Sequence, residues 1–209
     1  QVHLDAQPIV DMRRGPVAVE GLLRWTHPEL GPVPPGDFVR LAEDMGYMET
    51  LGDWVLVEAC RQFRDFNDRD IKLPRVAINV SAMEFDARFV RRVGEVLRDS
   101  GIAASQLELG LTESIMNNND PDALAALQTL SEGGVYLAVD DFGTGYSPIS
   151  YLGQYPLDEL KLHRNFLQEA SRSESGAKLL VGIIAMARIL GLRVMASGVE
   201  TESQFRFLT

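Results

Sequence analysis

Several apolar runs of this sequence end in a side chain that carries a carboxylate or an amide oxygen. These side chains are Glu20, Asn79, Glu113, Asp140 and Asp141. Carboxylates that are packed together repel one another and lose hydration, so such a group persists where a positive charge compensates it. Oxygen ligands without cysteine or histidine are typical of hard divalent cations such as Mg²⁺ or Mn²⁺. If these side chains meet in space, the sequence predicts a metal site.

Other features of the same set indicate chemistry on a phosphate. The adjacent Asp140 and Asp141 could let one carboxylate bridge two ions while the next binds the second, as in two-metal phosphoryl chemistry. Lys161 would place an ammonium among these groups, and Arg24, which follows Glu20 in the same run, could bind a phosphate. Each residue alone has an ordinary explanation, because a carboxylate at a strand end is usually a solvated cap and Lys161 could merely pair with a neighbour. The combination is what favours a functional site.

Short β-branched runs, which alternate with longer amphipathic ones, must position these residues. The strands are expected at 2–10, 17–25, 75–81, 107–112, 136–142, 159–163 and 193–196. The gap between the first two runs is too short for a crossover helix, so they should form an antiparallel hairpin. The later strands alternate with helical stretches, which predicts a mostly parallel sheet.

The intervening helices are expected at 35–45, 51–67, 87–99, 121–130 and 177–190, with a last one beginning near residue 202. This order predicts an α/β fold, a modified (β/α)8 TIM-type barrel with an antiparallel first strand, with an open doubly wound sheet as the alternative. We favour the barrel because its strand ends converge on one face, and the polar residues fall at those ends. The chain stops before an eighth barrel strand, so we expect 1–209 to be a single truncated barrel domain within a longer native chain.

The composition limits the partners. The formal net charge of −10 disfavours a nucleic acid polymer, since phosphate chains are normally bound by a basic face. A small nucleotide remains compatible if cations or arginines invert the local field. The sequence has no stretch near the roughly 18 apolar residues of a membrane span and no signal peptide, so we expect no membrane contact from this segment and a cytoplasmic location.

At these positions the sequence resembles the EAL family of cyclic di-GMP phosphodiesterases, over essentially its whole length. The matching motifs are Gln7-Pro8-Ile9, Glu20-Gly21-Leu22-Leu23-Arg24-Trp25, Asn79-Val80-Ser81-Ala82, Leu111-Thr112-Glu113-Ser114 and Asp140-Asp141-Phe142-Gly143-Thr144-Gly145-Tyr146-Ser147. The second motif has glycine for the middle alanine of the signature that names the family. The resemblance implies metal-assisted hydrolysis of one phosphodiester bond of cyclic di-GMP, which gives the linear dinucleotide.

The resemblance also implies a role for individual residues. It places Glu20, Asn79, Glu113, Asp140 and Asp141 on metal-binding positions, Lys161 on the site lysine, and Gln7, Leu22 and Arg24 on nucleotide-contacting positions. Catalysis would then rest on Lys161 with the carboxylates of Glu20, Asp140 and Asp141. The loop 142–150 resembles a family loop that couples ligand binding to dimerisation, so a homodimer is a further expectation. A plain strand-to-helix turn would use the same glycines.

Three further positions depart from the family pattern. Ser197 replaces the first glutamate of the Glu-Gly-Val-Glu motif, and His163 replaces an aspartate shortly after the site lysine. Gly110 lies where many members have glutamate, which we expect to be a milder change. His163 could be a tolerated replacement, a metal ligand or a general base, since imidazole titrates near neutral pH.

Three functions therefore stay open. The first is a cyclic di-GMP phosphodiesterase whose activity is weakened by Ser197 and His163. The second is a catalytically inactive cyclic di-GMP receptor, and the third is a scaffold for protein partners. The matching metal positions favour the first, and the two replacements favour the second. Linked signalling domains are compatible with all three.

Overall fold

The fold is a mixed sheet with helices, seen in a computed structural model that describes residues 1–116, 120–144 and 152–208. The strands are β1 (Val2–Asp11), β2 (Gly15–His27), β3 (Gly31–Val33), β4 (Val76–Val80), β5 (Leu107–Thr112), β6 (Tyr136–Phe142), β7 (Glu159–Leu162) and β8 (Arg193–Ala196). The helices are α1 (Pro35–Asp44), α2 (Met48–Asp68), α3 (Ala87–Ser100), α4 (Pro121–Glu132), α5 (Arg164–Arg172), α6 (Glu174–Ile189) and α7 (Glu202–Leu208). Two short 3₁₀ turns, η1 (Ala104–Gln106) and η2 (Glu113–Ile115), flank β5.

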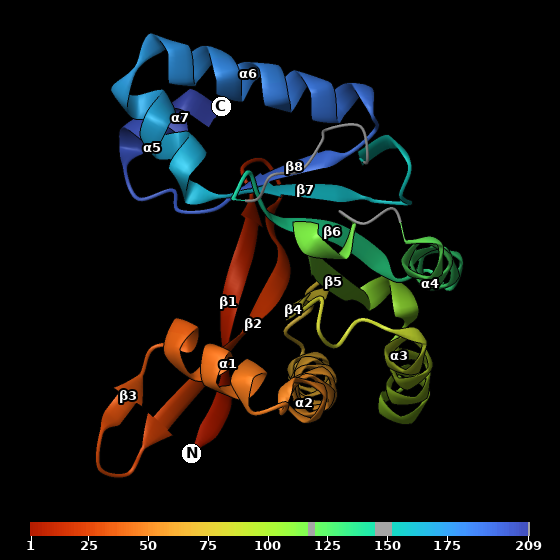
Figure 1. The fold of residues 1–209 in the computed structure, drawn as a ribbon. Coiled ribbons are helices and arrows are strands. Elements are labelled where there is room, and N and C mark those ends of the chain that lie inside the picture. Colours follow the sequence, from red (N-terminus) through yellow and green to blue (C-terminus); the bar gives the residue numbers. More distant parts are fainter. Residues whose placement is uncertain (117–119, 145–151, 209) are drawn as a thin grey trace.

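The sheet curves into a half-barrel, with helices α2, α3, α4 and α6 around it (Figure 1). The strand order is β1-β2-β4-β5-β6-β7-β8, and β3 pairs with β2 beside this path. β1 and β2 are antiparallel, and every pair from β2 and β4 through to β7 and β8 is parallel. The predicted hairpin and the mostly parallel sheet are confirmed. Over the described strands the barrel stays open, because β1 and β8 end the path without pairing with each other.

One strand and one α-helix were not predicted from the sequence. β3 is a three-residue strand of glycine, proline and valine, and it lacks the apolar run that marks a strand. Helix α5 is short, and its N-terminus is capped by His163, whose Nδ1 accepts a hydrogen bond from the backbone N–H of Asn165. Histidine is not among the usual capping residues, so the start of this helix carried no sequence signal.

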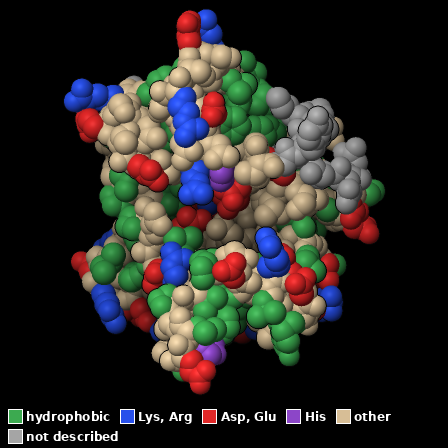
Figure 2. Space-filling model, turned by 60° about the vertical axis from the view of Figure 1, so that its left-hand side comes forward, with side chains coloured by type: hydrophobic (Ala, Val, Ile, Leu, Met, Phe, Trp, Pro, Cys, Tyr) green, Lys and Arg blue, Asp and Glu red, His purple; other side chains and the backbone are tan. Residues whose placement is uncertain are grey.

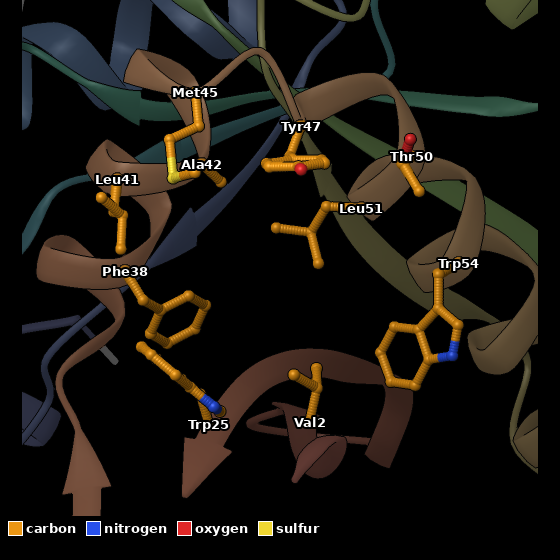
Figure 3. Close-up of a pocket in the computed structure, with 10 residues that line it drawn as sticks. All are labelled: Val2, Trp25, Phe38, Leu41, Ala42, Met45, Tyr47, Thr50, Leu51 and Trp54. Atoms are coloured by element: carbon orange, nitrogen blue, oxygen red, sulfur yellow. The ribbon is translucent and has the colours of Figure 1, made fainter. Parts of the chain in front are cut away.

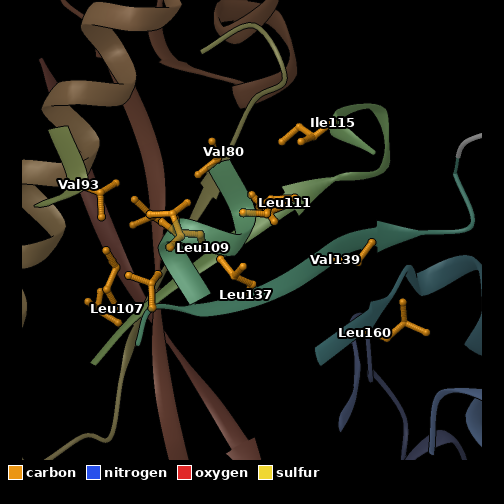
Figure 4. Close-up of a cluster of buried hydrophobic side chains, with 14 of the residues drawn as sticks. Val80, Val93, Leu107, Leu109, Leu111, Ile115, Leu137, Val139 and Leu160 are labelled. Atoms are coloured by element: carbon orange, nitrogen blue, oxygen red, sulfur yellow. The ribbon is translucent and has the colours of Figure 1, made fainter. Parts of the chain in front are cut away.

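The hydrophobic core lies on the outer, helix-covered side of the sheet. Its central side chains are Leu107, Leu109 and Leu111 of β5, Leu137 and Val139 of β6, and Leu160 of β7 (Figure 4). All of these are fully buried. Because successive side chains of a strand point to opposite faces, the residues between them must face the interior of the half-barrel. The core thus fixes which residues face inward.

None of the helices in the described part of the chain has both the length and the apolar character that a membrane crossing requires.

A buried carboxylate, Glu84, links the turn after β4 to helix α2. Its Oε1 accepts a hydrogen bond of 2.7 Å from the backbone N–H of Ser81. Its Oε2 has no hydrogen-bond partner in the described ranges, and it lies so close to Gly52 that a Cβ there would overlap it. Burial, with a smaller contribution from the charge of Asp53, raises the pKa of Glu84 to about 7.

Replacing Glu84 with glutamine is expected to stabilise the domain at alkaline pH. The folded-state pKa is raised above the ordinary value of 4.5, so the folded chain holds this proton more tightly than the unfolded chain. The stability that comes from the protonated group is complete below pH 4.5 and is lost as the pH rises through about 7. Glu84→Gln should therefore exceed the parent's free energy of unfolding by roughly 1–3 kcal/mol at pH 8 and by little at about pH 5.

Urea unfolding at both pH values measures this difference. The control is Glu132→Gln, which removes an exposed carboxylate of α4. A gain of equal size at both pH values would mean that glutamine improves packing and that the charge of Glu84 is not the cause.

Candidate functional site

The inner face of the half-barrel, opposite the leucine core, carries most of the predicted site residues. Asn79 lies between two buried residues of β4, Asp140 follows the buried Val139 of β6, and Lys161 lies between two buried leucines of β7. Strand alternation therefore turns these three side chains inward. Small apolar residues that precede the polar ones on the same strands, Ala18 and Ala77, pack together as a second buried cluster.

Four side chains, Glu20, Asn79, Asp140 and Lys161, form a central cluster on this face. Asn79 Nδ2 donates a hydrogen bond of 3.0 Å to Glu20 Oε1. Lys161 Nζ lies 3.9 Å from the same oxygen, and the lysine side chain is only 1% exposed. Asp140 is close enough for the charges of Lys161 and Glu20 to act on its carboxyl group. Strands that are far apart in sequence, β2, β4, β6 and β7, thus bring their polar residues together, as predicted.

The charges of the central cluster are strongly coupled. The pKa of Asp140 is raised to about 6, mainly by burial and to a smaller extent by the charges of Asp141 and Glu20, while the ammonium of Lys161 opposes the shift. Burial also favours the neutral amine of Lys161, but the charges of Glu108, Glu20 and Asp140 together outweigh burial and raise its pKa. Lys161 is therefore a buried cation that partly neutralises the carboxylates around it.

The backbone of β6 is irregular at the paired aspartates. Its register with β7 shifts between Val139 and Phe142, and Asp141 has a left-handed φ of 49°. Strict alternation of side chains does not hold across such an irregularity. Asp141 can therefore stay near Asp140, and its charge does raise the pKa of its neighbour.

Gly110, and not Glu113, is the β5 residue that lies inside the central cluster. A Cβ at Gly110 would come within 2.5 Å of Asn79 Oδ1 and 3.5 Å of Asp140 Cβ. Glu113 instead follows β5 in η2, where its Oε1 accepts a hydrogen bond from the backbone N–H of Gly143. Its Oε2 is buried without a partner among the residues that the structure describes. The lack of a side chain at position 110 therefore changes the central cluster directly, whereas from the sequence we expected a milder change.

The predicted nucleotide-contacting residues lie along the β1–β2 hairpin, on the same face as Glu20. Gln7 pairs with Glu20 across the two strands, and Leu22 pairs with Asp5. Arg24 lies one inward position beyond Leu22, and its Nε donates a hydrogen bond of 3.0 Å to Asp5 Oδ2. These side chains therefore extend from the central cluster along one face of the hairpin.

Comparison with known proteins decides the family. A family model described as the EAL domain matches residues 1–209. The chain belongs to the EAL family. The resemblance seen in its motifs is thereby confirmed over the full length of the sequence.

The relatives of this EAL domain include named enzymes. It is 42% identical over 211 residues to the bifunctional diguanylate cyclase/cyclic di-GMP phosphodiesterase MucR of Pseudomonas aeruginosa. It is 41% identical over 210 residues to the cyclic di-GMP phosphodiesterase NbdA of the same organism. Both alignments cover 100% of the domain but only 31% and 27% of the two relatives, so the chain spans less than a third of their length.

A solved structure of a relative confirms the fold. The cyclic di-GMP complex of the MucR phosphodiesterase matches this EAL domain with a TM-score of 0.93 at 42% identity. The match covers 100% of the domain and 85% of the solved chain. The half-barrel described above is therefore the EAL architecture.

The two replaced positions of this EAL domain lie at the ends of β7 and β8. The backbone N–H of Ser197 donates a hydrogen bond of 3.0 Å to the carbonyl of Leu162, so Ser197 continues the pairing of the two strands. His163 directly follows Leu162 and caps helix α5 through Nδ1, at 3.3 Å from the N–H of Asn165. While Nδ1 accepts this hydrogen bond, it is not available to a metal. The observed role of His163 is thus that of a helix cap.

EAL phosphodiesterases depend on metal ions in general. Among the described residues, no three or more acidic, histidine or cysteine side chains are placed to hold one ion together. The amide of Asn79 with the carboxylates of Glu20 and Asp140 nevertheless gives an oxygen set that suits a hard cation completed by water. Gly110 and Ser197 add no carboxylate to it. The residues present therefore offer ligands for a divalent ion.

A buried ion pair beneath the central cluster was missed in the sequence. Lys161 Nζ lies 2.9 Å from Glu108 Oε1, and Glu108 Oε2 accepts a hydrogen bond of 3.2 Å from Arg75 Nε. The guanidinium of Arg75 in turn lies 3.9 Å from the centre of the Tyr136 ring. A signal for Glu108 was present, since it interrupts an apolar strand two residues before Gly110 and must share its inward face.

A large apolar pocket of this domain lies away from the central cluster. It has a volume of about 470 Å³ and is lined by Val2, Trp25, Phe38, Leu41, Ala42, Met45, Tyr47, Thr50, Leu51 and Trp54 (Figure 3). Val2 pairs with Trp25, and Gln7 pairs with Glu20. These two pairs are an odd number of residues apart on each strand, so their side chains point to opposite faces of the hairpin, and the pocket lies on the face away from Glu20. No predicted site residue lines it, and we do not place the ligand there.

The face drawn in Figure 2 carries acidic and basic side chains side by side, without a continuous basic patch.

Proposed function

We propose that this EAL domain binds cyclic di-GMP over the central cluster and that its metal-dependent hydrolysis of the nucleotide is weak. One observation carries the proposal. The inner face keeps Glu20, Asn79, Asp140 and Lys161 together, while the inward position 110 is glycine and position 197, at the end of β8, is serine. The superposition on the cyclic di-GMP complex of the MucR phosphodiesterase supports the ligand.

The central cluster and the hairpin have different roles in nucleotide binding. Lys161 and Arg24 supply the positive charges that meet the phosphates, since charge-assisted hydrogen bonds to phosphate are the stronger ones. Gln7 and Leu22 lie on the same face of the hairpin and contact the rest of the nucleotide. Arg24 is held by Asp5 in the free domain, so binding must compete with this ion pair.

The hydrolytic part requires Mg²⁺ or Mn²⁺, which when bound polarises a phosphoryl oxygen and lowers the pKa of a water molecule. Glu20, Asn79, Asp140 and Asp141 would hold the ion. Lys161 orients the attacking water through its ammonium. Water adds to phosphorus, one P–O ester bond breaks, and the linear dinucleotide leaves with a terminal phosphate. We assigned Glu113 to the metal from the resemblance, but its bond to Gly143 supports a role in fixing the loop after β6.

One experiment separates the open functions. Cyclic di-GMP is incubated with the domain and Mn²⁺, the linear dinucleotide is quantified, and binding is measured by calorimetry in parallel. We expect binding with little product. Rapid product formation would establish a competent phosphodiesterase. The absence of both binding and product would favour the third function, a scaffold for protein partners.

Arg24→Ala is expected to weaken the binding of cyclic di-GMP by roughly 1.5–3 kcal/mol, the scale of a hydrogen bond to a charged group. Calorimetry with the parent and the variant measures it. Arg40→Ala, which removes an exposed arginine of α1, changes the net charge equally and should bind like the parent. Equal affinity in Arg24→Ala and the parent would remove Arg24 from the phosphate site.

The setting of the domain is also a proposal. We infer a single domain within a longer cytoplasmic chain with linked signalling domains, since MucR and NbdA are more than three times its length. The homodimer predicted from the loop 142–150 remains a prediction, because residues 145–151 lie outside the described residues.

A further inference from the structure

Lys161 lies between two sets of carboxylates on the inner face. On one side Glu108 Oε1 is 2.9 Å from its Nζ, and on the other side Glu20 Oε1 is 3.9 Å away. The side chains of Lys161 and Glu108 are both only 1% exposed. Charges buried this deeply persist when they are paired, so each of the two depends on the other.

Glu108 is itself anchored from the side opposite Lys161. Its Oε2 accepts a hydrogen bond from Arg75, whose side chain is 12% exposed. The guanidinium groups of Arg75 and Arg193 lie 3.9 Å and 4.7 Å from the centre of the Tyr136 ring. The hydroxyl of Tyr136 donates to Glu159 at 3.2 Å. This set of contacts holds Glu108 in place, so the position of Lys161 follows from it.

The ion pair leaves the ammonium of Lys161 with unused donors. Nζ and Glu108 Oε1 lie 2.9 Å apart, and Nζ has no other hydrogen-bond acceptor in the described part of the chain. An ammonium group has three donors. A water or a phosphate oxygen above the central cluster can therefore bind to Lys161 while Glu108 keeps the ion pair.

We propose that Glu108 is the positioning residue of Lys161, and that it holds the ammonium away from Glu20 so that the carboxylates of the central cluster stay available to a cation. Without Glu108, the nearest counter-charge is Glu20, and the ammonium would close the 3.9 Å gap to it. The site would also lose one negative charge. Both changes oppose a divalent ion. This inference rests on the proposed function, because Lys161 belongs to the same site, but its test uses no nucleotide.

The test is Glu108→Gln, followed by its crystal structure and by Mn²⁺ titration calorimetry. We expect Lys161 Nζ to move to within about 3 Å of Glu20 Oε1, an ordinary charge-assisted distance. We expect the affinity for Mn²⁺ to fall at least about tenfold, as for other residues that orient a ligand set. A lysine that stays beside residue 108 overturns the proposal, and so does an unchanged affinity for Mn²⁺.

A double-mutant cycle distinguishes positioning from general damage. In a Lys161→Met background, Glu108→Gln should lower the Mn²⁺ affinity much less than in the parent, because the ammonium that it releases is absent and only the lost negative charge acts. This double variant removes both charges of the buried pair, which is better tolerated than removal of one, and so keeps the comparison possible if Glu108→Gln folds poorly. A loss of affinity in this background as large as the loss in the parent would contradict positioning.

Tyr136→Phe is the matched control. It breaks the hydrogen bond to Glu159 in the same buried network and leaves the pair of Lys161 and Glu108 in place. It should lower stability and keep the Mn²⁺ affinity within about twofold of the parent, since the position of the ammonium is unchanged. Failure of the parent to bind cyclic di-GMP would refute the proposed function and would not touch this result.

Discussion

Ser197→Glu is expected to raise the kcat for cyclic di-GMP hydrolysis at least about tenfold, or roughly 1.4 kcal/mol of barrier. Serine offers a short neutral hydroxyl at the end of β8, next to the strand that carries Lys161. A carboxylate there would strengthen the hold on the metal and help to orient the attacking water. Nucleotide affinity should change much less than kcat.

The structure adds Gly110→Glu to this prediction. A side chain at position 110 enters the central cluster against Asn79 and Asp140, so a glutamate there would supply a second missing carboxylate. The double variant Gly110→Glu/Ser197→Glu should turn over faster than the product of the single effects if both carboxylates serve the same ions. Asn79 must give way, which changes its hydrogen bond to Glu20, and its side chain is exposed.

The measurement is the linear dinucleotide formed per minute at saturating Mn²⁺ for the parent, the single variants and the double variant. His163→Asp is the informative companion, since aspartate preserves the cap of α5 while it restores a charge. Lys161→Met in the double variant should abolish the gain. A parent that already matches Ser197→Glu would show that the site tolerates serine, and we would then describe the domain as a competent phosphodiesterase.

Gly143→Ala is expected to destabilise the domain by roughly 2–4 kcal/mol, the sum of a backbone and a packing penalty. Gly143 has a φ of 93°, which a residue with a Cβ rarely adopts. The added Cβ would also overlap the ring of Phe166 on α5. Because the N–H of Gly143 binds Glu113, the change should also disturb the link between β5 and the loop after β6.

Gly134→Ala separates the two penalties. Gly134 has a similar φ of 89°, but its nearest neighbour, Ala104 Cβ, would be 3.8 Å from the new atom. It should cost only the backbone part, about 1–2 kcal/mol. Urea unfolding of both variants gives the comparison, and equal losses would mean that Phe166 moves aside without cost.

Much of the fold and the core of the site followed from local patterns. Short β-branched runs placed the seven strands of the barrel path, and the short gap after the first run gave the hairpin. The polar residues near the ends of these runs, Glu20, Asn79, Asp140 and Lys161, were expected together because the strand ends of a parallel barrel converge on one face. These predictions needed only the position of each strand and the direction of the sheet.

Other features depended on contacts between distant segments. From the resemblance we assigned Glu113 to the metal and expected the glycine at position 110 to be a mild change. In the structure β5 ends before Glu113, whose side chain accepts a hydrogen bond from Gly143. Gly110 is instead the β5 residue that faces the central cluster. The capping role of His163 likewise depended on how the chain turns after β7.

The sequence by itself determined which residue types the barrel interior would hold, since alternation along a strand is a local property. The tertiary structure decided which of them touch. Lys161 is paired with Glu108 from β5 at 2.9 Å and stands 3.9 Å from Glu20 of β2. That difference of one ångström depends on the register between strands and on the anchor at Arg75, which no local pattern encodes. It leaves the carboxylates of the central cluster available, because the buried ammonium has its nearest counter-charge below them.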